Sequence, residues 1–448
     1  MKTVILKFIA MSFLIAFLGS GLEASEINVG IGVNLSFGEL SSSSTMTMTD
    51  KKGARISGKN LKFSVSGKSV IVSGKAFTPP LQIRSSSPIV YNKRPYLGFF
   101  KVTLSRGRLF VVNVIDVESY LRGVLKMEVN PGWPKESLKA QAIISRTYAL
   151  NQMGRHGSDG FDVCATQHCQ VYRGINAHDR AIDKAISETK GKVLTYKGSL
   201  AKTLFHSDSG GITAAAKDVW GGDLPYLVSV SDPVSSSSPH SKWTASLTGS
   251  QIGTALARIG QNIGTATSIS VLSRDGSGRV LDMEVLGTSG RIKIRAHKFR
   301  EALGGSLVKS TSFTLRGSAS LPTSEPLKPA PNRPNLSDIL SPAEERLLMM
   351  LTKQGAFSSD ELIAMLMDPS KKRYFIQKAQ GKAPLQPQTP VIAERKPASG
   401  GGFILEGKGW GHGVGLSQWG AMALASSGWS AERILAHYYP GTSIAIRK

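Results

Sequence analysis

A carboxylic acid on an apolar helix face is the first feature of this sequence that could do chemistry. Residues 116–128 predict a single helix, capped at its start by Asp116. Glu128 shares the apolar face of that helix with Leu121 and Leu125. Burial, together with the negative end of the helix dipole, would raise the pKa of the carboxyl. An acid that keeps its proton near neutral pH can act as a general acid, notably in glycoside cleavage. The alternative is a frayed, solvated helix end without a special role.

A second helical pattern follows at once and supplies two cations. It covers residues 135–153, and the short connection predicts that the two helices pack as a hairpin. Lys139 and Arg146 share one face of this helix, which can point back at Glu128. Either cation could bind a substrate carboxylate or lower the pKa of Glu128, and a solvated cationic face is the alternative. The sequence does not decide between these roles.

Four motifs of unusual composition follow one another along the chain. They are VLKMEVNPGWPKESLKAQAIISRTYAL from Val124, TLFHSDSGG from Thr203, the SGRV and LVKSTSF pieces from Ser277 and Leu307, and GKGWGHGVGLSQWGA from Gly407. In composition and order they resemble the SpoIID/LytB family, whose sporulation members are lytic transglycosylases acting on peptidoglycan. The resemblance covers most of residues 95–320 together with residues 400–448.

The resemblance implies a mechanism that needs one carboxyl group. Glu128 would protonate the glycosidic oxygen between N-acetylmuramic acid and N-acetylglucosamine, and the same carboxylate would then accept the proton of the muramoyl 6-hydroxyl. That hydroxyl attacks the anomeric carbon, so a 1,6-anhydro end forms without water. Lys139 and Arg146 would position lactyl or peptide carboxylates. The predicted substrate-binding residues are Lys139, Arg146, Tyr148, His206, Ser207, Ser209, His412 and Gln418.

The second and fourth motifs, which begin at Thr203 and Gly407, are predicted to form the walls of a sugar groove. His206, Ser207 and Ser209 lie in a polar turn that can hydrogen-bond to glycan, although a turn satisfied within itself is the alternative. Residues 407–421 are dense in glycine, which permits a tight loop, and tryptophan faces are natural platforms for sugar rings. We expect this segment to complete the groove. Its side chains of interest are Trp410, His412, Gln418 and Trp419.

The only two cysteines lie close together in the sequence. Cys164, His168 and Cys169 could supply up to three ligands to zinc, with water or a distant residue as the fourth. A disulfide between the two cysteines is an equal alternative, and free thiols are a lesser one. Some members of the resembled family bind zinc in this segment through a Cys and a His. In each case the expected role is structural.

Charge and the N-terminus indicate an exported protein. Residues 1–24 combine two lysines, a short apolar run and small residues, as in a cleavable signal peptide. The formal net charge of the 448-residue chain is +24, which would attract anionic wall polymers or lipid headgroups. Nucleic acid is not expected as a partner, because no aromatic-and-basic recognition motif accompanies the charge. We therefore expect a location outside the cytoplasm, in the periplasm, the cell wall or the medium.

Composition divides the chain into parts of an α+β fold. After the signal peptide we expect a β-rich part, a mixed α/β catalytic core with the helix hairpin, a helical insert flanked by proline-rich linkers, and a return to the core. The insert either packs on itself or forms a docking module or lid. The predicted bounds of the four parts are residues 26–110, 113–320, 321–402 and 403–448.

Two other functions remain open from the sequence. Some LytB-type relatives modify a separate amidase, and such a protein would hold glycan without cutting it, with a wall amidase or another wall-remodelling protein as its partner. A true hydrolase would need a second carboxylate, for which Glu136 and Asp208 are the candidates. The mass of the product separates the three, because an anhydro end is one water lighter than a hydrolysed end.

Overall fold

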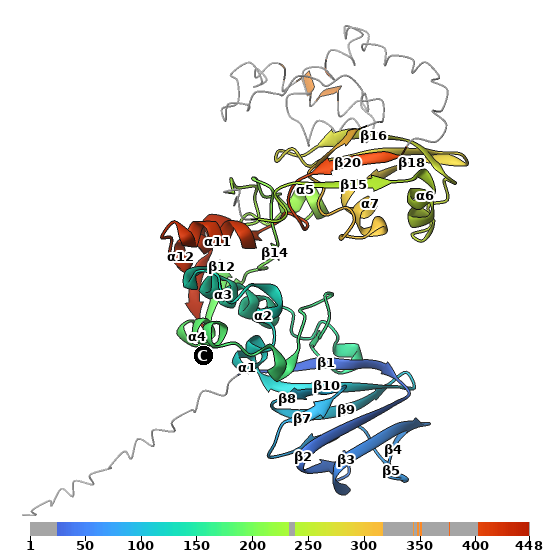
Figure 1. Ribbon diagram of the computed structural model, residues 1–448, viewed down its shortest axis with the longest axis vertical. Helices are drawn as coiled ribbons and strands as arrows, with labels where there is room; N and C mark the ends of the chain where they lie inside the picture. Colours follow the sequence, from blue (N-terminus) through green and yellow to red (C-terminus); the bar gives the residue numbers. More distant parts are fainter. Residues whose placement is uncertain are drawn as a thin grey trace, which may run out of the picture. The chain divides into compact units, whose positions relative to one another are not determined.

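The chain divides into two compact units, of which the first is described almost completely (Figure 1). The first unit combines residues 1–318 with 401–448, and the second holds residues 319–400. The predicted signal peptide and almost all of the predicted insert lie outside the described residues. The helices and sheets of the first unit confirm the α+β class. The computed structural model describes residues 25–232, 238–316 and 402–447, with residues 344, 347, 348, 350, 351 and 376.

Ten strands of the β-rich part and one strand from a later segment, β11, form one eleven-stranded sheet. Its main path runs β11-β1-β10-β9-β6-β2-β3-β4-β5, and the β7–β8 hairpin pairs with β2. Alternating apolar residues give the sheet its core, as the sequence pattern predicts. The strands are β1 (Glu26–Leu35), β2 (Phe37–Thr49), β3 (Arg55–Ser66), β4 (Ser69–Val72), β5 (Lys75–Phe77), β6 (Leu81–Arg84), β7 (Ile89–Tyr91), β8 (Arg94–Tyr96), β9 (Phe99–Ser105), β10 (Arg108–Asp116) and β11 (Val163–Cys164).

Strand β10 connects this sheet to the helices. It lies between β1 and β9, and residues 109–115 are buried, so its end is held firmly by the sheet. Its last residue, Asp116, accepts a hydrogen bond from the backbone N–H of Ser119 at 3.0 Å and caps the first helix, as predicted. The start of the helix hairpin is therefore fixed by a central strand.

A second core lies between helices from both ends of the first unit. The long helix α3 has one apolar face in the core of the large sheet and another in this second core, which also holds α11 and α12 from the C-terminus. The elements of this layer are α1 (Val117–Arg122), α2 (Leu125–Glu128), α3 (Lys135–Asn151), η1 (Gly157–Asp159), η2 (Gly174–Ala177), α4 (Arg180–Glu188), β12 (Lys192–Tyr196), β13 (Ser199–Leu200), β14 (Phe205–His206), α5 (Ala216–Trp220), β21 (Leu416–Ser417), α11 (Gln418–Ser426), α12 (Ala431–Tyr438) and β22 (Ser443–Ile446).

A third core within residues 243–316 and 403–407 was not foreseen, because the sequence analysis assigned residues 113–320 to one core. Two three-stranded sheets and two helices enclose it, and a hairpin turn around Asp275 joins two of its strands. Both sheets are antiparallel. The elements are β15 (Trp243–Leu247), α6 (Gly249–Ala257), β16 (Ala266–Arg274), β17 (Val280–Gly287), β18 (Gly290–Arg295), α7 (Ala296–Leu303), β19 (Phe313–Arg316) and β20 (Phe403–Gly407).

Candidate active site

The helix that ends at Glu128 is broken in two, which corrects the prediction of one continuous helix. Helix α1 ends at Arg122 with Gly123 as its C-cap, and α2 adds a single turn that ends at Glu128. A Cβ at Gly123 would lie 2.3 Å from a ring carbon of Tyr172, so the close approach of that ring requires glycine. The packing of Tyr172 therefore sets the position where the chain changes direction.

Glu128 is partly buried, and this burial raises the pKa of its carboxyl to about 7. The only opposing influence is a hydrogen bond with the backbone of Val171, which favours the charged form. Neither Lys139 nor Arg146 contributes to this shift. The question that the sequence left open is thus answered: burial controls the protonation of Glu128, and the two cations do not.

The predicted role of Arg146 in binding substrate is wrong in this structure, because its side chain is buried against another partner, whereas Lys139 is partly exposed and stays a predicted contact. The Arg146 guanidinium is buried and forms two 2.7 Å hydrogen bonds with the carboxylate of Glu118. The Lys139 ammonium lies 2.9 Å from one carboxylate oxygen of Glu136, and the other oxygen of that carboxylate accepts the backbone N–H of Ala431. The Arg146 pair joins α3 to α1, whereas the Lys139 pair lies within α3 and leaves Glu136 to bind the first turn of α12.

A row of polar side chains beside Glu128 was missed by the sequence analysis. The Tyr120 hydroxyl donates to Gln170 at 3.2 Å, and the Gln170 amide donates to the Ser145 carbonyl at 3.4 Å. Gln141 donates to the Ser145 hydroxyl at 3.2 Å, and its own buried Oε1 has no partner among the described residues. Burial raises the pKa of Tyr120 well above its usual range, and the charge of Glu128 adds to this.

Helix α3 contributes the polar row at helical spacing. Gln141, Ser145 and Tyr148 follow one another at i, i+4 and i+7, and Tyr148 is the one member that the sequence analysis selected. The Tyr148 ring is partly exposed, and burial raises the pKa of its hydroxyl. Polar residues at helical spacing on an otherwise apolar helix were the sequence signal for this row. The prediction relied instead on the two cations of the adjacent face.

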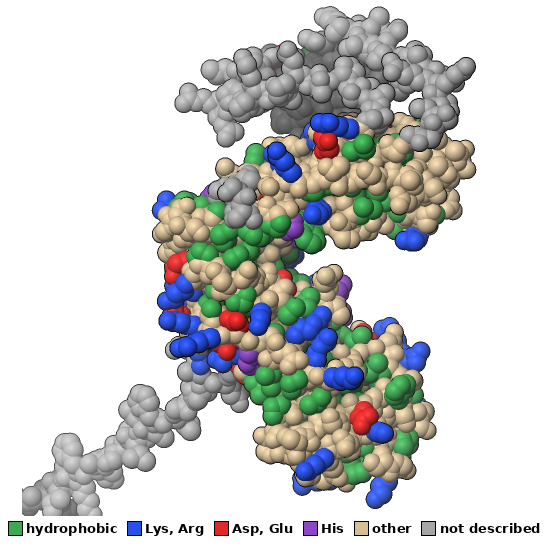
Figure 2. Space-filling model, viewed as in Figure 1, with side chains coloured by type: hydrophobic (Ala, Val, Ile, Leu, Met, Phe, Trp, Pro, Cys, Tyr) green, Lys and Arg blue, Asp and Glu red, His purple; other side chains and the backbone are tan. Residues whose placement is uncertain are grey.

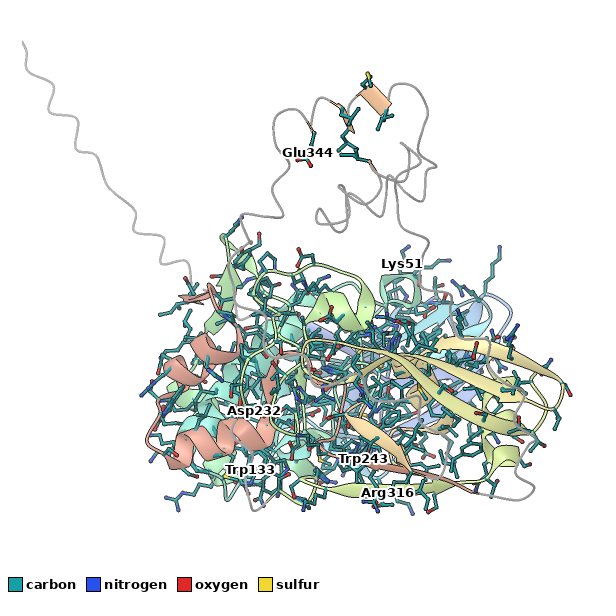
Figure 3. The ribbon with its side chains drawn as sticks, turned by 90° about the horizontal axis from the view of Figure 1, so that it is seen from above. Lys51, Trp133, Asp232, Trp243, Arg316 and Glu344 are labelled. Carbon is teal, nitrogen blue, oxygen red and sulfur yellow. The ribbon has the colours of Figure 1, made fainter. Side chains whose placement is uncertain are left out.

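Two tryptophans connect the hairpin to the glycine-rich segment. Trp133, five residues after Glu128, packs edge-to-face on Trp419, with ring centroids 5.1 Å apart. Figure 3 shows Trp133 beside the red C-terminal helices. Both rings are partly exposed, so Trp419 remains a predicted sugar platform. Trp410 packs instead on His240, at 4.5 Å between ring centroids.

The two predicted groove motifs meet, as expected, but several of their side chains hold the loops together. Strands β14 and β21 pair in parallel, and Asp208 and Trp410 exchange two backbone hydrogen bonds. The predictions for His206, Ser209 and Gln418 need correction, because all three side chains are buried. Ser207 and His412 are partly exposed and remain predicted substrate contacts.

Asp232 is the centre of this loop cluster and has no signal in the sequence. It accepts hydrogen bonds from the hydroxyls of Ser209, Tyr438 and Ser417. Burial raises the pKa of its carboxyl, and these three donors oppose the shift. Figure 3 labels its position in the molecule. Asp232 thus connects the motif that begins at Thr203 to the C-terminal helices α11 and α12.

A buried arginine from the third core completes the cluster. Arg279, from the SGRV piece, donates to the carbonyl of Ser209. A Cβ at Gly413 would lie 2.7 Å from the guanidinium carbon, so a glycine is needed there. Burial, followed by the charges of Arg300 and Arg279, lowers the pKa of His412 to about 4. The pKa of buried His206 also lies well below its usual range, so both imidazoles are neutral at physiological pH.

The candidate second carboxylates are both engaged elsewhere. Glu136 binds Lys139 and the first turn of α12, as described above. Asp208 is buried and accepts the backbone N–H of Gly210 at 2.7 Å and the hydroxyl of Ser238. Neither side chain is among the groups that shift the pKa of Glu128. The structure therefore offers no support for a carboxylate pair.

A candidate metal centre lies beside the same helices. Its four residues are His156, Cys164, His168 and Cys169, whose potential ligand atoms all lie within 4.8 Å of one another. His156 was missed by the sequence analysis, because it precedes Cys164 by eight residues and folds back through η1. Both cysteines are free, so the disulfide that the sequence left open is not formed in this structure.

The distances within this cluster suit tetrahedral zinc. The Cys169 sulfur lies 3.4 Å from His156 Nε2 and 3.5 Å from His168 Nδ1, and the Cys164 sulfur lies 3.6 Å from the same Nδ1. Ligands at zinc distances are roughly 3.3–3.8 Å apart on a tetrahedron. Gln170 and Val171 follow Cys169 directly, so the cluster anchors the segment that contacts Tyr120 and Glu128.

Two family models match parts of this chain. Residues 105–196, which include α1, α2 and α3, match the model of the stage II sporulation protein family, SpoIID. Residues 235–325, which hold most of the third core, match a domain of unknown function, DUF8618. The fold and site thus define a protein built around a SpoIID domain. Named relatives support a similarity of the chain to the SpoIID/LytB family, which is associated with cell-wall remodelling.

Three relatives are each between 24% and 27% identical to this chain. An amidase enhancer of Bacillus subtilis is 27% identical over 398 residues, which cover 86% of this chain and 49% of the relative. This chain therefore spans about half the length of that relative. A stage II sporulation protein D of Bacillus amyloliquefaciens is 24% identical over 75% of each chain. An uncharacterised protein of Brachyspira hyodysenteriae is 26% identical over 78% of this chain and 72% of its own.

Proposed function

We propose that this protein is a peptidoglycan lytic transglycosylase in which Glu128 is the catalytic acid and base. The observation that supports this most strongly is the partly buried carboxyl of Glu128, whose pKa is raised to about 7. Such a group is protonated in a large fraction of molecules near neutral pH and can also work as a base after it has given up the proton. A single residue of this kind suits a reaction that uses no water.

In the proposed reaction Glu128 gives its proton to the oxygen that links muramoyl C1 to the next sugar. The C1–O4 bond breaks, and positive charge develops at C1 and the ring oxygen. The carboxylate of Glu128 then accepts the proton of the muramoyl 6-hydroxyl, and the new O6–C1 bond closes the anhydro ring. All atoms of the substrate are kept, and Glu128 ends protonated as it began. Tyr148, Ser207, His412 and Trp419 are the partly exposed side chains proposed to contact the glycan.

The test of this function is a digestion of purified glycan strands, with and without stem peptides, followed by mass measurement of the products. We expect 1,6-anhydro ends from the wild type and none from Glu128→Gln. The matched control is Glu301→Gln, an exposed glutamate on α7 that should leave the products unchanged. Anhydro products from Glu128→Gln would contradict the assignment of Glu128, and reducing ends from the wild type would indicate hydrolysis instead.

The second candidate function is that of a glycan-binding enhancer of a wall amidase. It is supported by the amidase enhancer of Bacillus subtilis, whose similarity covers 86% of this chain. A binder of this kind would release no product of its own from glycan strands, yet would increase the release of stem peptides by an added amidase. The same digestion, repeated with and without an amidase, separates the two functions.

We further propose a structural zinc held by His156, Cys164, His168 and Cys169. Two thiolates and two imidazoles are a donor set that zinc prefers, and four protein ligands leave no open position for catalysis. The bound metal would stabilise the fold around the segment next to Glu128. We expect about one zinc per chain by elemental analysis, and its loss together with a lower Tm in Cys169→Ser. A zinc-free protein whose Tm is insensitive to chelators would contradict this.

Export by the predicted signal peptide, residues 1–24, is proposed as well. Among the described residues, no helix is both long and apolar enough to span a membrane. Sequencing of the N-terminus of protein recovered outside the cytoplasm should give a start after Ala24. A chain retained inside the cell with Met1 in place would contradict the proposal.

A further inference from the structure

The β-rich part carries many cations without acidic partners. Residues 26–116 contain 13 Lys and Arg residues but only 4 Asp and Glu residues. Every ion pair in the described part of the chain instead joins side chains between Glu118 and Glu432. In Figure 2 blue side chains outnumber red ones over this sheet. Lys and Arg side chains that form no ion pair keep their charge available for an anionic ligand.

A large open cavity lies in the same part, away from Glu128. Its volume is about 1100 Å³, and β2, β3 and the turn between β7 and β8 contribute to its walls. It shares no lining residue with the polar row around Glu128. The lining residues that matter for the argument are Phe37, Glu39, Lys62, Tyr91, Lys93 and Arg108.

The cavity combines positive charge with an exposed aromatic ring. Phe37 is 73% exposed although it is apolar, and Lys93 and Arg108 are both exposed. Glu39 lies directly opposite Lys62 in the β2–β3 ladder and is the only acid in the lining, so Lys93 and Arg108 have no acidic counterpart there. An aromatic face binds sugar rings, whereas cations bind carboxylates.

We infer that this cavity is a second glycan-binding site, which holds carboxylate-bearing glycan strands of the wall at a distance from the catalytic acid. The choice of wall glycan rests on the proposed function; the charge and aromatic character of the cavity do not. The aromatic ring favours a sugar chain over a purely ionic polymer, and the excess of cations favours an acidic sugar chain over a neutral one. A site of this kind keeps the enzyme on its polymer between cleavage events.

The test compares two double charge reversals in the full chain, each made together with Glu128→Gln so that the glycan is not consumed. Lys93→Glu with Arg108→Glu changes the cavity. Lys51→Glu with Lys52→Glu changes the net charge equally, at two exposed residues of the β2–β3 turn outside the lining. We expect about tenfold weaker binding to peptide-bearing glycan for the first pair and less than about threefold for the second. Phe37→Ala should also weaken binding to glycan but not to polyglutamate.

Three outcomes would overturn the inference. Equal losses from both charge reversals would mean that net charge alone attracts the glycan. Undiminished binding to glycan whose carboxylates have been amidated would exclude the proposed chemistry. Tighter binding of a polyglycerol phosphate, lost in the same cavity variant, would assign the cavity to phosphate polymers.

Failure of the proposed function would give a different result. In that case no variant, with or without Glu128, would produce anhydro ends, while the cavity variant would still lose binding. If both proposals hold, the cavity pair in a chain with native Glu128 should cleave short soluble glycan fragments at the wild-type rate. It should cleave long insoluble strands more slowly.

Discussion

Two regions of this protein each bury a carboxyl group, and they use it differently. Burial raises the pKa of both Glu128 and Asp232. Around Asp232 three hydroxyl donors oppose that shift, whereas around Glu128 a single backbone hydrogen bond does. A carboxyl bound by many donors is fixed in place and holds loops together. A carboxyl with few donors keeps its proton and can exchange it with a substrate.

The largest expected effect distinguishes these two carboxyls by activity. Glu128→Gln should reduce transglycosylase turnover by at least about a hundredfold, because general acid–base catalysis contributes at least that much. Asp232→Asn should leave the turnover of the folded protein within about tenfold of the wild type. A rate assay on glycan fragments checks both, with Glu301→Gln as the control. Equal losses in the two variants would remove the distinction.

The next largest effect is expected at Arg146, a buried cation that is held in place by Glu118. Arg146→Leu should lower the free energy of unfolding by about 3–5 kcal/mol, because it leaves Glu118 without its partner. Lys139→Leu is the matched control on the same helix, and the loss of its pair with Glu136 should cost about 1 kcal/mol or less. Denaturant unfolding measures both. If Arg146→Leu were as stable as the wild type but failed to bind substrate, the original substrate-binding role would be restored.

The sequence predicted these two regions unequally. It identified Glu128, its apolar surroundings, the cap at Asp116 and the meeting of the two groove motifs, since these follow from local periodicity and turn composition. It misjudged Arg146, because helical spacing shows which residues share a face but not which acid lies opposite. Glu118, 28 residues from Arg146 in the sequence, is such a long-range partner.

Residues whose roles come only from tertiary contacts gave little or no signal. Asp232 lies 206 residues before its donor Tyr438, and Arg279 lies 70 residues from the Ser209 carbonyl it binds. The break at Gly123 depends on the ring of Tyr172, which no local pattern shows. The third core, likewise, was hidden because its strands follow the same alternation as those before it.

The pH dependence of the unfolding free energy gives a further test of the raised pKa of Glu128. The folded pKa of Glu128 is about 7, against an ordinary value of 4.5, so the unfolded chain loses this proton first as the pH rises. The contribution of Glu128 to stability therefore falls by about 3 kcal/mol between these two pH values. Glu128→Gln cannot ionise, so its stability relative to the wild type should rise by that amount from pH 4 to pH 8. A pH-independent difference, as expected for Glu301→Gln, would contradict the raised pKa.

A smaller effect is expected from the well-bound carboxyl. Asp232→Asn should cost about 1–3 kcal/mol of unfolding free energy, because the amide cannot accept all the hydrogen bonds donated by Ser209, Tyr438 and Ser417. Tyr438→Phe, which removes one of these donors, should cost less, about 1 kcal/mol. Thermal unfolding of the two variants measures the difference. No loss in either variant would mean that the cluster does not hold the loops.

The central claim is that Glu128 keeps its proton near neutral pH, and an NMR titration tests it most directly. In protein labelled with ¹³C at the glutamate carboxyl carbons, the Glu128 signal can be assigned by its absence in Glu128→Gln. We predict a midpoint at about pH 7 for this signal, well above those of the exposed glutamates. A midpoint near 4.5, the ordinary value for glutamate, would contradict the account of how this residue acts as an acid.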